Sequence, residues 1–246
     1  MWSALQGRVN NRLARHFRAA PHRLPVHVPM VSFTFDDAPD SAAGEGAELL
    51  EQHGGRGTYY LAGSLIDRPS DHWHGLSNDA IVRLHRVGHE IACHTFSHQS
   101  SATLGEAAMA REIERNRSHF RGIDASITLE NFAYPYGIAS VWRKPQLAKA
   151  FSARGILPGV NSGVIDLQFL RASPLVDCEI DKAGIDRYFD EAVASGGWLI
   201  FYGHDVTTRP SPYGCTPHLM RHALEAAGKR NMPIVTVAEA LRRIGA

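Results

Sequence analysis

Short apolar runs alternate with amphipathic stretches along this 246-residue chain, and no other sequence feature restricts its fold as strongly. The runs 31–35, 57–63, 89–93, 131–134 and 198–202 are predicted as strands, and the stretches 77–87, 182–194 and 216–229 as helices. Such alternation is typical of parallel strands joined by crossover helices. About seven or eight such units can close a (β/α) barrel. We therefore expect an α/β barrel, with an open doubly wound sheet as the alternative.

Other segments carry weaker signals. A capping box at Thr103–Glu106 predicts a helix that runs to about Phe120. We expect a helix at 145–153, a strand at 155–160, and a last strand at 233–237 followed by a helix to Ile244. Residues 164–180 are ambiguous, and the run Phe169–Leu170 is a candidate for the end of a sixth strand.

Composition and charge exclude several classes of protein. Apolar residues make up 44% and charged residues 21%, and the net charge is +1, so nothing indicates a nucleic-acid-binding surface. The chain has no apolar run long enough for a transmembrane helix, and the first 17 residues lack the apolar core of a secretory signal. Its three cysteines, an odd and sparse set, favour a reducing compartment. We expect a cytoplasmic protein.

The N-terminus is predicted as a basic extension, residues 1–30, before a barrel domain at 31–246. Five apolar residues recur there at near-helical spacing between arginines: Trp2, Leu5, Val9, Leu13 and Phe17. Two interpretations are open. Such a helix can pack on the barrel with its arginines in solvent, or it can place residues 1–20 on an anionic membrane as a peripheral contact.

Polar residues follow several predicted strands at the point where each strand ends. Asp36 and Asp37 follow the first strand, His94 and His98 the third, and His204 the strand at 198–202. Parallel strands bring such residues to one face of the fold. Two histidines at i, i+4 with one carboxylate are a common metal-ligand set. The second aspartate would remain a base, and His204 suits a positioned acid.

Each of these features also has an ordinary structural interpretation. The two histidines could lie on a surface loop, the aspartates could cap a helix, and His204 could be a core-edge histidine. Their shared position at strand ends favours the functional interpretation.

Four segments resemble, in order, the successive motifs of the polysaccharide deacetylase family, the NodB-type enzymes of carbohydrate esterase family 4. They are TFDD (34–37), HTFSH (94–98), YPYG (134–137) and IFYGHD (200–205). The resemblance extends from about Val31 to Val237. It implies a distorted (β/α) barrel of about seven parallel strands and one divalent metal ion, usually zinc.

By motif position, the resemblance implies a role for each matching residue. Asp37, His94 and His98 would bind the metal, Asp36 would be the general base, and His204 the general acid. The backbone N–H of Tyr136 would stabilise the oxyanion. Trp73, on the loop after the second strand, could stack on a sugar ring or pack against the protein.

The chain departs from the family pattern at Ala133, where an arginine commonly steadies the catalytic aspartate. We expect Arg171, after the run Phe169–Leu170, to donate to Asp36 instead, and the alternative is that Arg171 is a solvated surface charge. The aspartate that orients the catalytic histidine is also hard to place, and Asp166 and Asp205 are both candidates.

The expected activity is metal-dependent removal of an acetyl group from an N-acetylated sugar of a polysaccharide or its precursor. Two alternatives remain open. One is the same chemistry on a non-sugar amide or an O-acetyl ester. The other is an inactive carbohydrate-binding relative, which the departure at Ala133 motivates. The sequence does not indicate the sugar, the metal used in the cell or the oligomeric state.

Overall fold

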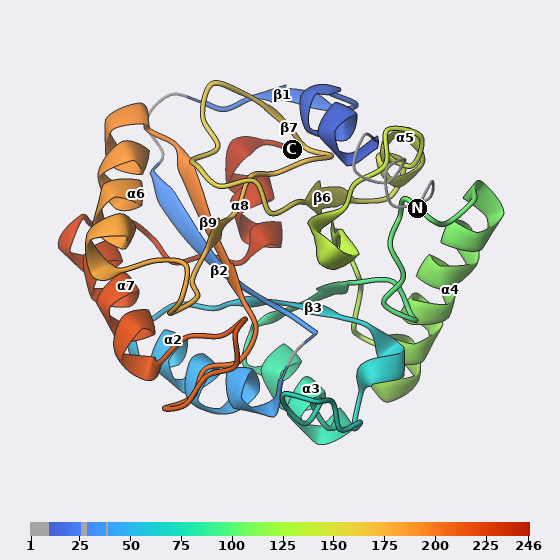
Figure 1. Ribbon diagram of the computed structural model, residues 1–246, viewed down its shortest axis with the longest axis horizontal. Helices are drawn as coiled ribbons and strands as arrows, with labels where there is room; N and C mark the ends of the chain where they lie inside the picture. Colours follow the sequence, from blue (N-terminus) through green and yellow to red (C-terminus); the bar gives the residue numbers. More distant parts are fainter. Residues whose placement is uncertain (1–9, 26–28, 38) are drawn as a thin grey trace.

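A computed structural model describes residues 10–25, 29–37 and 39–246 of the chain (Figure 1). Its centre is a curled sheet of seven parallel strands in the order β6-β5-β4-β3-β2-β9-β8. The strands are β2 (Met30–Asp36), β3 (Thr58–Leu61), β4 (Glu90–Cys93), β5 (Asn131–Ala133), β6 (Ser152–Arg154), β8 (Ser173–Pro174) and β9 (Trp198–Gly203). The predicted barrel of about seven parallel strands is confirmed.

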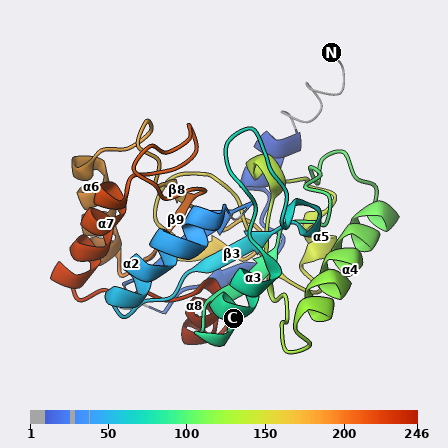
Figure 2. The same cartoon turned by 90° about the horizontal axis from the view of Figure 1, so that it is seen from below.

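Helices surround this sheet on the outside (Figure 1), and Figure 2 shows α4 and the α6–α7 pair at opposite ends of the molecule. They are α2 (Ala47–Gln52), α3 (Asn78–Arg86), α4 (Glu106–Ile123), α5 (Lys144–Leu147), α6 (Lys182–Ser195), α7 (Pro217–Lys229) and α8 (Val237–Ile244). Among the described residues, no helix is long and apolar enough to cross a membrane.

The neighbouring strands β2 and β9 are almost entirely buried, so their polar side chains need partners inside the protein. Every residue of β2 is buried. The Trp198 ring N–H donates to Ser32 Oγ over 3.0 Å, and Thr34 Oγ1 donates to the carbonyl of Phe201 over 2.8 Å. The two buried hydroxyl groups of β2 are therefore paired, as the low polarity around them requires. Their pairing fixes β2 against β9. Asp36 is the last residue of β2, and His204 directly follows β9.

Several expected boundaries were wrong, mostly where elements are very short. The helix expected at 145–153 ends at Leu147, and residues 152–154 form β6 instead of a strand at 155–160. Residues 233–237 contribute a single bridge, Ile234 to Val31, and Val237 already begins α8. The predicted capping box is also wrong, because α4 begins after Gly105 and Thr103 Oγ1 donates to the carbonyl of Ser100.

Part of the predicted N-terminal extension is built into the fold. Residues 10–16 are helical with Ala14 fully buried, and β1 (Pro21–Arg23) pairs antiparallel with β7 (Val164–Asp166). The ammonium group of Lys144 donates to the carbonyls of Ala14 and Phe17 and to Asp166. Arg12 and Arg15 remain exposed. Residues 10–16 thus pack on the barrel through Ala14, whereas Leu13 and Phe17, which were expected on the apolar face, are exposed. Trp2, Leu5 and Val9 lie outside the described residues.

We expect the buried contact between Lys144 and Asp166 to hold the N-terminal segment. Asp166→Ala would leave a buried ammonium group without its counter-charge, and it should lower the free energy of unfolding by about 3 kcal/mol. Denaturant unfolding measures this change, and hydrogen exchange should show faster exchange in residues 10–25. Arg121→Ala removes an exposed ion pair with Glu114 and should cost less than ~1 kcal/mol. Equal effects of the two variants would contradict the prediction.

Candidate active site

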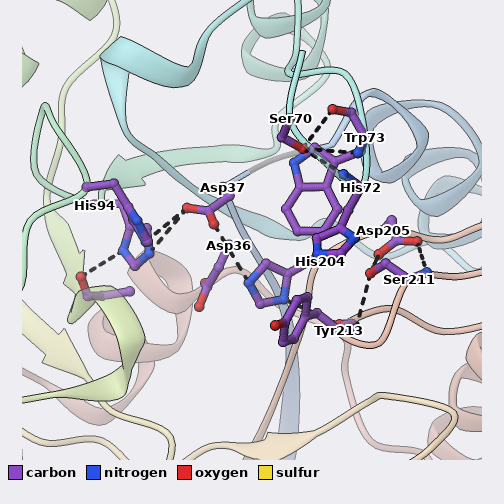
Figure 3. A network of polar contacts seen from close by, with 12 residues as sticks. Asp36, Asp37, Ser70, His72, Trp73, His94, His204, Asp205, Ser211 and Tyr213 are labelled. Atoms are coloured by element: carbon purple, nitrogen blue, oxygen red, sulfur yellow. Dashed lines mark hydrogen bonds and ion pairs between the residues drawn. The ribbon is translucent and has the colours of Figure 1, made fainter. Parts of the chain in front are cut away.

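One cavity of about 720 Å³ lies at the carboxyl ends of the strands. Six of the seven predicted site residues line it: Asp36, Asp37, His94, His98, Tyr136 and His204. Figure 3 shows the two aspartates between His94 on one side and His204 on the other. The seventh, Arg171, does not line this cavity. The barrel thus brings together residues that are up to 168 positions apart, from Asp36 to His204.

Asp37, His94 and His98 form a compact set of donor atoms. Asp37 Oδ1 lies 3.2 Å from His98 Nε2 and 3.7 Å from His94 Nε2, and one atom from each residue lies within 4.8 Å of the others. His94 Nδ1 donates to the carbonyl of Ala133 over 2.9 Å, so the neutral ring presents a lone pair at Nε2. Burial lowers the pKa of His94 to about 3, which keeps this ring neutral.

This donor set fits a divalent metal ion. Asp37 Oδ1 is buried and has no hydrogen-bond partner within the described part of the chain. Burial raises the pKa of Asp37 to about 6, because the charged carboxylate is poorly solvated. A buried carboxylate oxygen that faces imidazole lone pairs is unfavourable unless a cation lies among them. Two imidazoles and one carboxylate are also a ligand set that zinc accepts with a position left open.

Strained backbone places these side chains. Asp37, Thr95, His98 and Tyr136 all have left-handed backbone conformations, with φ between 51° and 61°. Residues other than glycine adopt this conformation at a cost of about 1–3 kcal/mol each, and such residues cluster at functional sites. In each case the chain leaves a strand and turns sharply within a few residues. The turns place Asp37, His98 and Tyr136 at the cavity, whereas Thr95, which follows His94 in sequence, is buried.

A buried ion pair holds Asp36, but its partner is not the predicted one. Arg154, at the end of β6, donates from Nη2 to Asp36 Oδ1, and both residues are buried. Burial alone would raise the pKa of Asp36, but Arg154, with His94 and His204 nearby, holds it below the usual value. Asp36 is therefore a carboxylate at neutral pH.

The predicted contact of Arg171 with Asp36 is wrong. Arg171 follows no strand of the main sheet, and its Nη2 donates to the carbonyl of Pro158. It lines a separate cavity with Arg15 and Arg18. The sequence signal that was missed is a three-residue strand, Ser152–Arg154, which ends in an arginine and pairs with β5 so that Arg154 lies opposite Ala133.

The packing around Arg154 explains how it reaches Asp36. Tyr60, Ala92 and Ala133 form a buried cluster, and the guanidinium of Arg154 lies 4.8 Å from the centre of the Tyr60 ring. A second ring, Tyr202, lies 5.8 Å away. Aromatic faces stabilise a cation at such distances. Two alanines leave space for the guanidinium, and two tyrosine rings flank it.

His204 lies across the cavity from the two histidines of the HTFSH motif. Its Nε2 is 4.0 Å from Asp37 Oδ2, and its Nδ1 donates to the carbonyl of Tyr213 over 3.3 Å. The Trp73 ring packs against it, with 5.4 Å between ring centres (Figure 3). This contact favours packing as the role of Trp73, although the ring also lines the cavity.

Neither predicted aspartate contacts the His204 side chain. Asp205 accepts hydrogen bonds from the amide and the hydroxyl of Ser211, so it shapes the turn that presents Tyr213 (Figure 3). Asp166 pairs with Lys144 beneath the N-terminal segment. The backbone carbonyl of Tyr213 takes the position at Nδ1 that an aspartate was expected to hold.

Comparisons with known proteins agree with this geometry. Residues 23–151 match the polysaccharide deacetylase family. A chitin deacetylase of Pestalotiopsis sp. is 25% identical over 214 residues, which are 85% of this chain and 63% of that protein. A chitooligosaccharide deacetylase of Sinorhizobium fredii is 30% identical over 128 residues, 51% of this chain and 54% of that protein. The chain thus spans less than two thirds of the length of either relative.

Solved structures share the fold at low sequence identity. PdaA of Bacillus subtilis, a family 4 carbohydrate esterase, superposes with a TM-score of 0.63 at 13% identity, covering 97% of this chain and 89% of PdaA. A family 4 acetyl xylan esterase from Clostridium thermocellum, in complex with cobalt, gives 0.59 at 22% identity, covering 88% and 92%. The sequence match and the shared fold lead to one conclusion: this chain belongs to the polysaccharide deacetylase family.

Proposed function

We propose that this protein is a metal-dependent deacetylase that hydrolyses the N-acetyl group of a sugar in a polysaccharide or its precursor. One observation carries the proposal. A metal-ligand set, a buried carboxylate held by an arginine, and a histidine on the opposite side all line one cavity. The similarity to proteins named chitin and chitooligosaccharide deacetylases supports a substrate with N-acetylated amino sugars.

Asp37, His94 and His98 would hold the metal ion, for which we propose zinc. When bound, the ion would polarise the acetyl carbonyl and lower the pKa of the attacking water. His94 suits this role because its Nδ1 is fixed by the Ala133 carbonyl, which orients the ring.

The other residues would move protons. Asp36 is ionised, and only its Oδ1 accepts a hydrogen bond from Arg154. Its carboxylate can therefore take a proton from water as the water oxygen bonds to the acyl carbon. The N–H of Tyr136 would donate to the oxygen that becomes negative. His204 would give a proton to the nitrogen as the C–N bond breaks. The products are acetate and a free amine.

Two alternatives differ in the bond or in the activity itself. Water attack of this kind also serves O-acetyl esters, and one structural relative is named an acetyl xylan esterase. A panel that compares acetate release from N-acetylglucosamine oligomers, acetylated xylan and a non-sugar acetamide separates these substrates. An inactive carbohydrate-binding protein would release no acetate from any of them.

A cytoplasmic location and a membrane contact of residues 1–20 stay predictions.

The metal site gives the first prediction for this function. We expect one zinc ion per chain in purified protein, lost on dialysis against a chelator together with acetate release, and both restored by zinc. His98→Ala should lose the ion as well, because it removes one of three ligands. Metal analysis by mass spectrometry measures this directly. A His98→Ala protein with full metal content would show that the ion is held elsewhere.

Substitutions of the two aspartates should have different effects on metal content and on kcat. Asp36→Asn should keep the metal and lower kcat about 10²–10⁴-fold, because the base is removed while the three ligands remain. Asp37→Asn should lose the metal. Parallel measurement of metal content and kcat for both variants tests the assignment. If Asp36→Asn were the variant that lost the metal, the two roles would have to be exchanged.

The role of Arg154 can be tested by moving the arginine to another position beside Asp36. Arg154→Ala should lower kcat at least tenfold with the metal retained, because Asp36 loses the cation that keeps it ionised and oriented. The double variant Ala133→Arg, Arg154→Ala moves the arginine to the neighbouring strand, directly across the pairing. It should recover part of the lost kcat. Arg171→Ala is the matched control and should leave kcat unchanged. An Arg171→Ala protein as impaired as Arg154→Ala would contradict this assignment.

A further inference from the structure

The turn that carries the two histidines of the HTFSH motif receives its main support from a helix outside the motif. Glu112, on α4, accepts hydrogen bonds from the amide of Phe96 over 3.1 Å and from the amide of Ser97 over 2.7 Å. Its other carboxylate oxygen accepts from Ser97 Oγ over 3.1 Å. One half-buried side chain thus binds three donors of a five-residue turn.

This turn needs external support because its own backbone is strained. Thr95 and His98, on either side of the supported residues, both have positive φ, 58° and 51°. Amide groups in such a turn cannot bond to each other as in a helix, so they need another acceptor. A carboxylate suits two adjacent amides because charged acceptors form the stronger hydrogen bonds. The carboxylate of Glu112 thus binds the two residues in the middle of the strained segment, Phe96 and Ser97.

The surroundings of Glu112 show a polar face of α4 that serves the loops of the active-site end. Asn116, one helical turn further, accepts from the amide of Gly63 and donates to the carbonyl of Leu61, each over 2.9 Å. Between them, Arg115 stacks on the Phe96 ring at 3.8 Å. Residues that face a barrel from a covering helix are usually apolar. Here two polar side chains fix the loops after β3 and β4.

We propose that Glu112 is a positioning residue for the metal site, acting through the turn that sets the distance between His94 and His98. The inference rests on the proposed function, since it assumes that these histidines bind the ion. Glu112 itself lies outside the ligand set and does not line the cavity. Residues that orient metal ligands typically change metal affinity about 10–100-fold when removed.

The experiment compares zinc dissociation constants of full-length, metal-stripped proteins by competition with a chromophoric chelator. Glu112→Ala should weaken zinc binding about 10–100-fold. Glu112→Gln keeps an acceptor oxygen and should lie between it and the wild type. Ser97→Ala removes one of the three bonds and should have the smallest effect. Glu114→Ala is the matched control, because Glu114 lies on the same helix, is exposed, and among the described residues forms its hydrogen bonds and ion pair with Arg121 and Ser118.

Two further readouts separate positioning from general stability. A residue that only stabilised the fold would lower the melting temperature of the metal-free protein and leave the zinc dissociation constant unchanged, which would overturn the proposal. Cobalt-substituted Glu112→Ala should show a visible absorption spectrum that differs from the wild-type spectrum. If Glu112→Ala did not fold, Glu112→Gln and Ser97→Ala would decide by the same measurements.

The outcomes for the two hypotheses differ. A wild-type protein that binds no zinc would refute the metal site of the proposed function, and this inference with it. If the wild-type protein binds zinc and both Glu112→Ala and Glu112→Gln bind it with the same affinity, only the role of Glu112 is refuted. The metal site of the proposed function would then stand.

Discussion

The buried ion pair between Asp36 and Arg154 is the contact on which the arrangement of the site depends. Two adjacent carboxylates at the end of a buried strand repel each other, and each needs a positive partner. Asp36 has Arg154, which is fully buried and lies between two tyrosine rings. Asp37 turns away through its left-handed backbone and faces the imidazoles. The geometry thus gives two neighbouring residues different surroundings, which suit the roles proposed for them, Asp36 as a base and Asp37 as a metal ligand.

Most of the fold, and the gathering of six of the seven predicted site residues around one cavity, could be predicted from the sequence because their signals are local. Strands such as 198–203 contain enough apolar residues to be recognised, and the rule that parallel strands share one active end then gathers the polar residues after them. The motif resemblance assigned roles that spacing alone left open, such as which aspartate is the base.

Arg154 could not be predicted because its strand is three residues long. Periodicity needs about four or more residues to indicate a strand. The sequence pattern places residues 152 and 153 at the end of the preceding helix and begins the next strand at 155, so it does not mark Arg154 as a strand-end residue. The expectation for Arg171 rests on a two-residue apolar run, Phe169–Leu170, which is an even weaker signal. Contacts between a covering helix and a loop, such as Glu112 with the HTFSH turn, carry no local signal, since the helix pattern marks Glu112 only as a polar position.

Ala133 and Arg154 are best understood as one unit. They lie opposite each other in the pairing of β5 with β6. The Cα atom of an arginine at either position would therefore lie at the same height along the strands. An arginine at 133 would meet Tyr60 and Ala92, which instead form a tight cluster with the alanine. Moving the arginine to β6 keeps one cation beside Asp36 while the small side chain on β5 leaves space for it. The departure at Ala133 was the reason to consider an inactive relative. Because the cation beside Asp36 is retained, that departure no longer argues against catalysis.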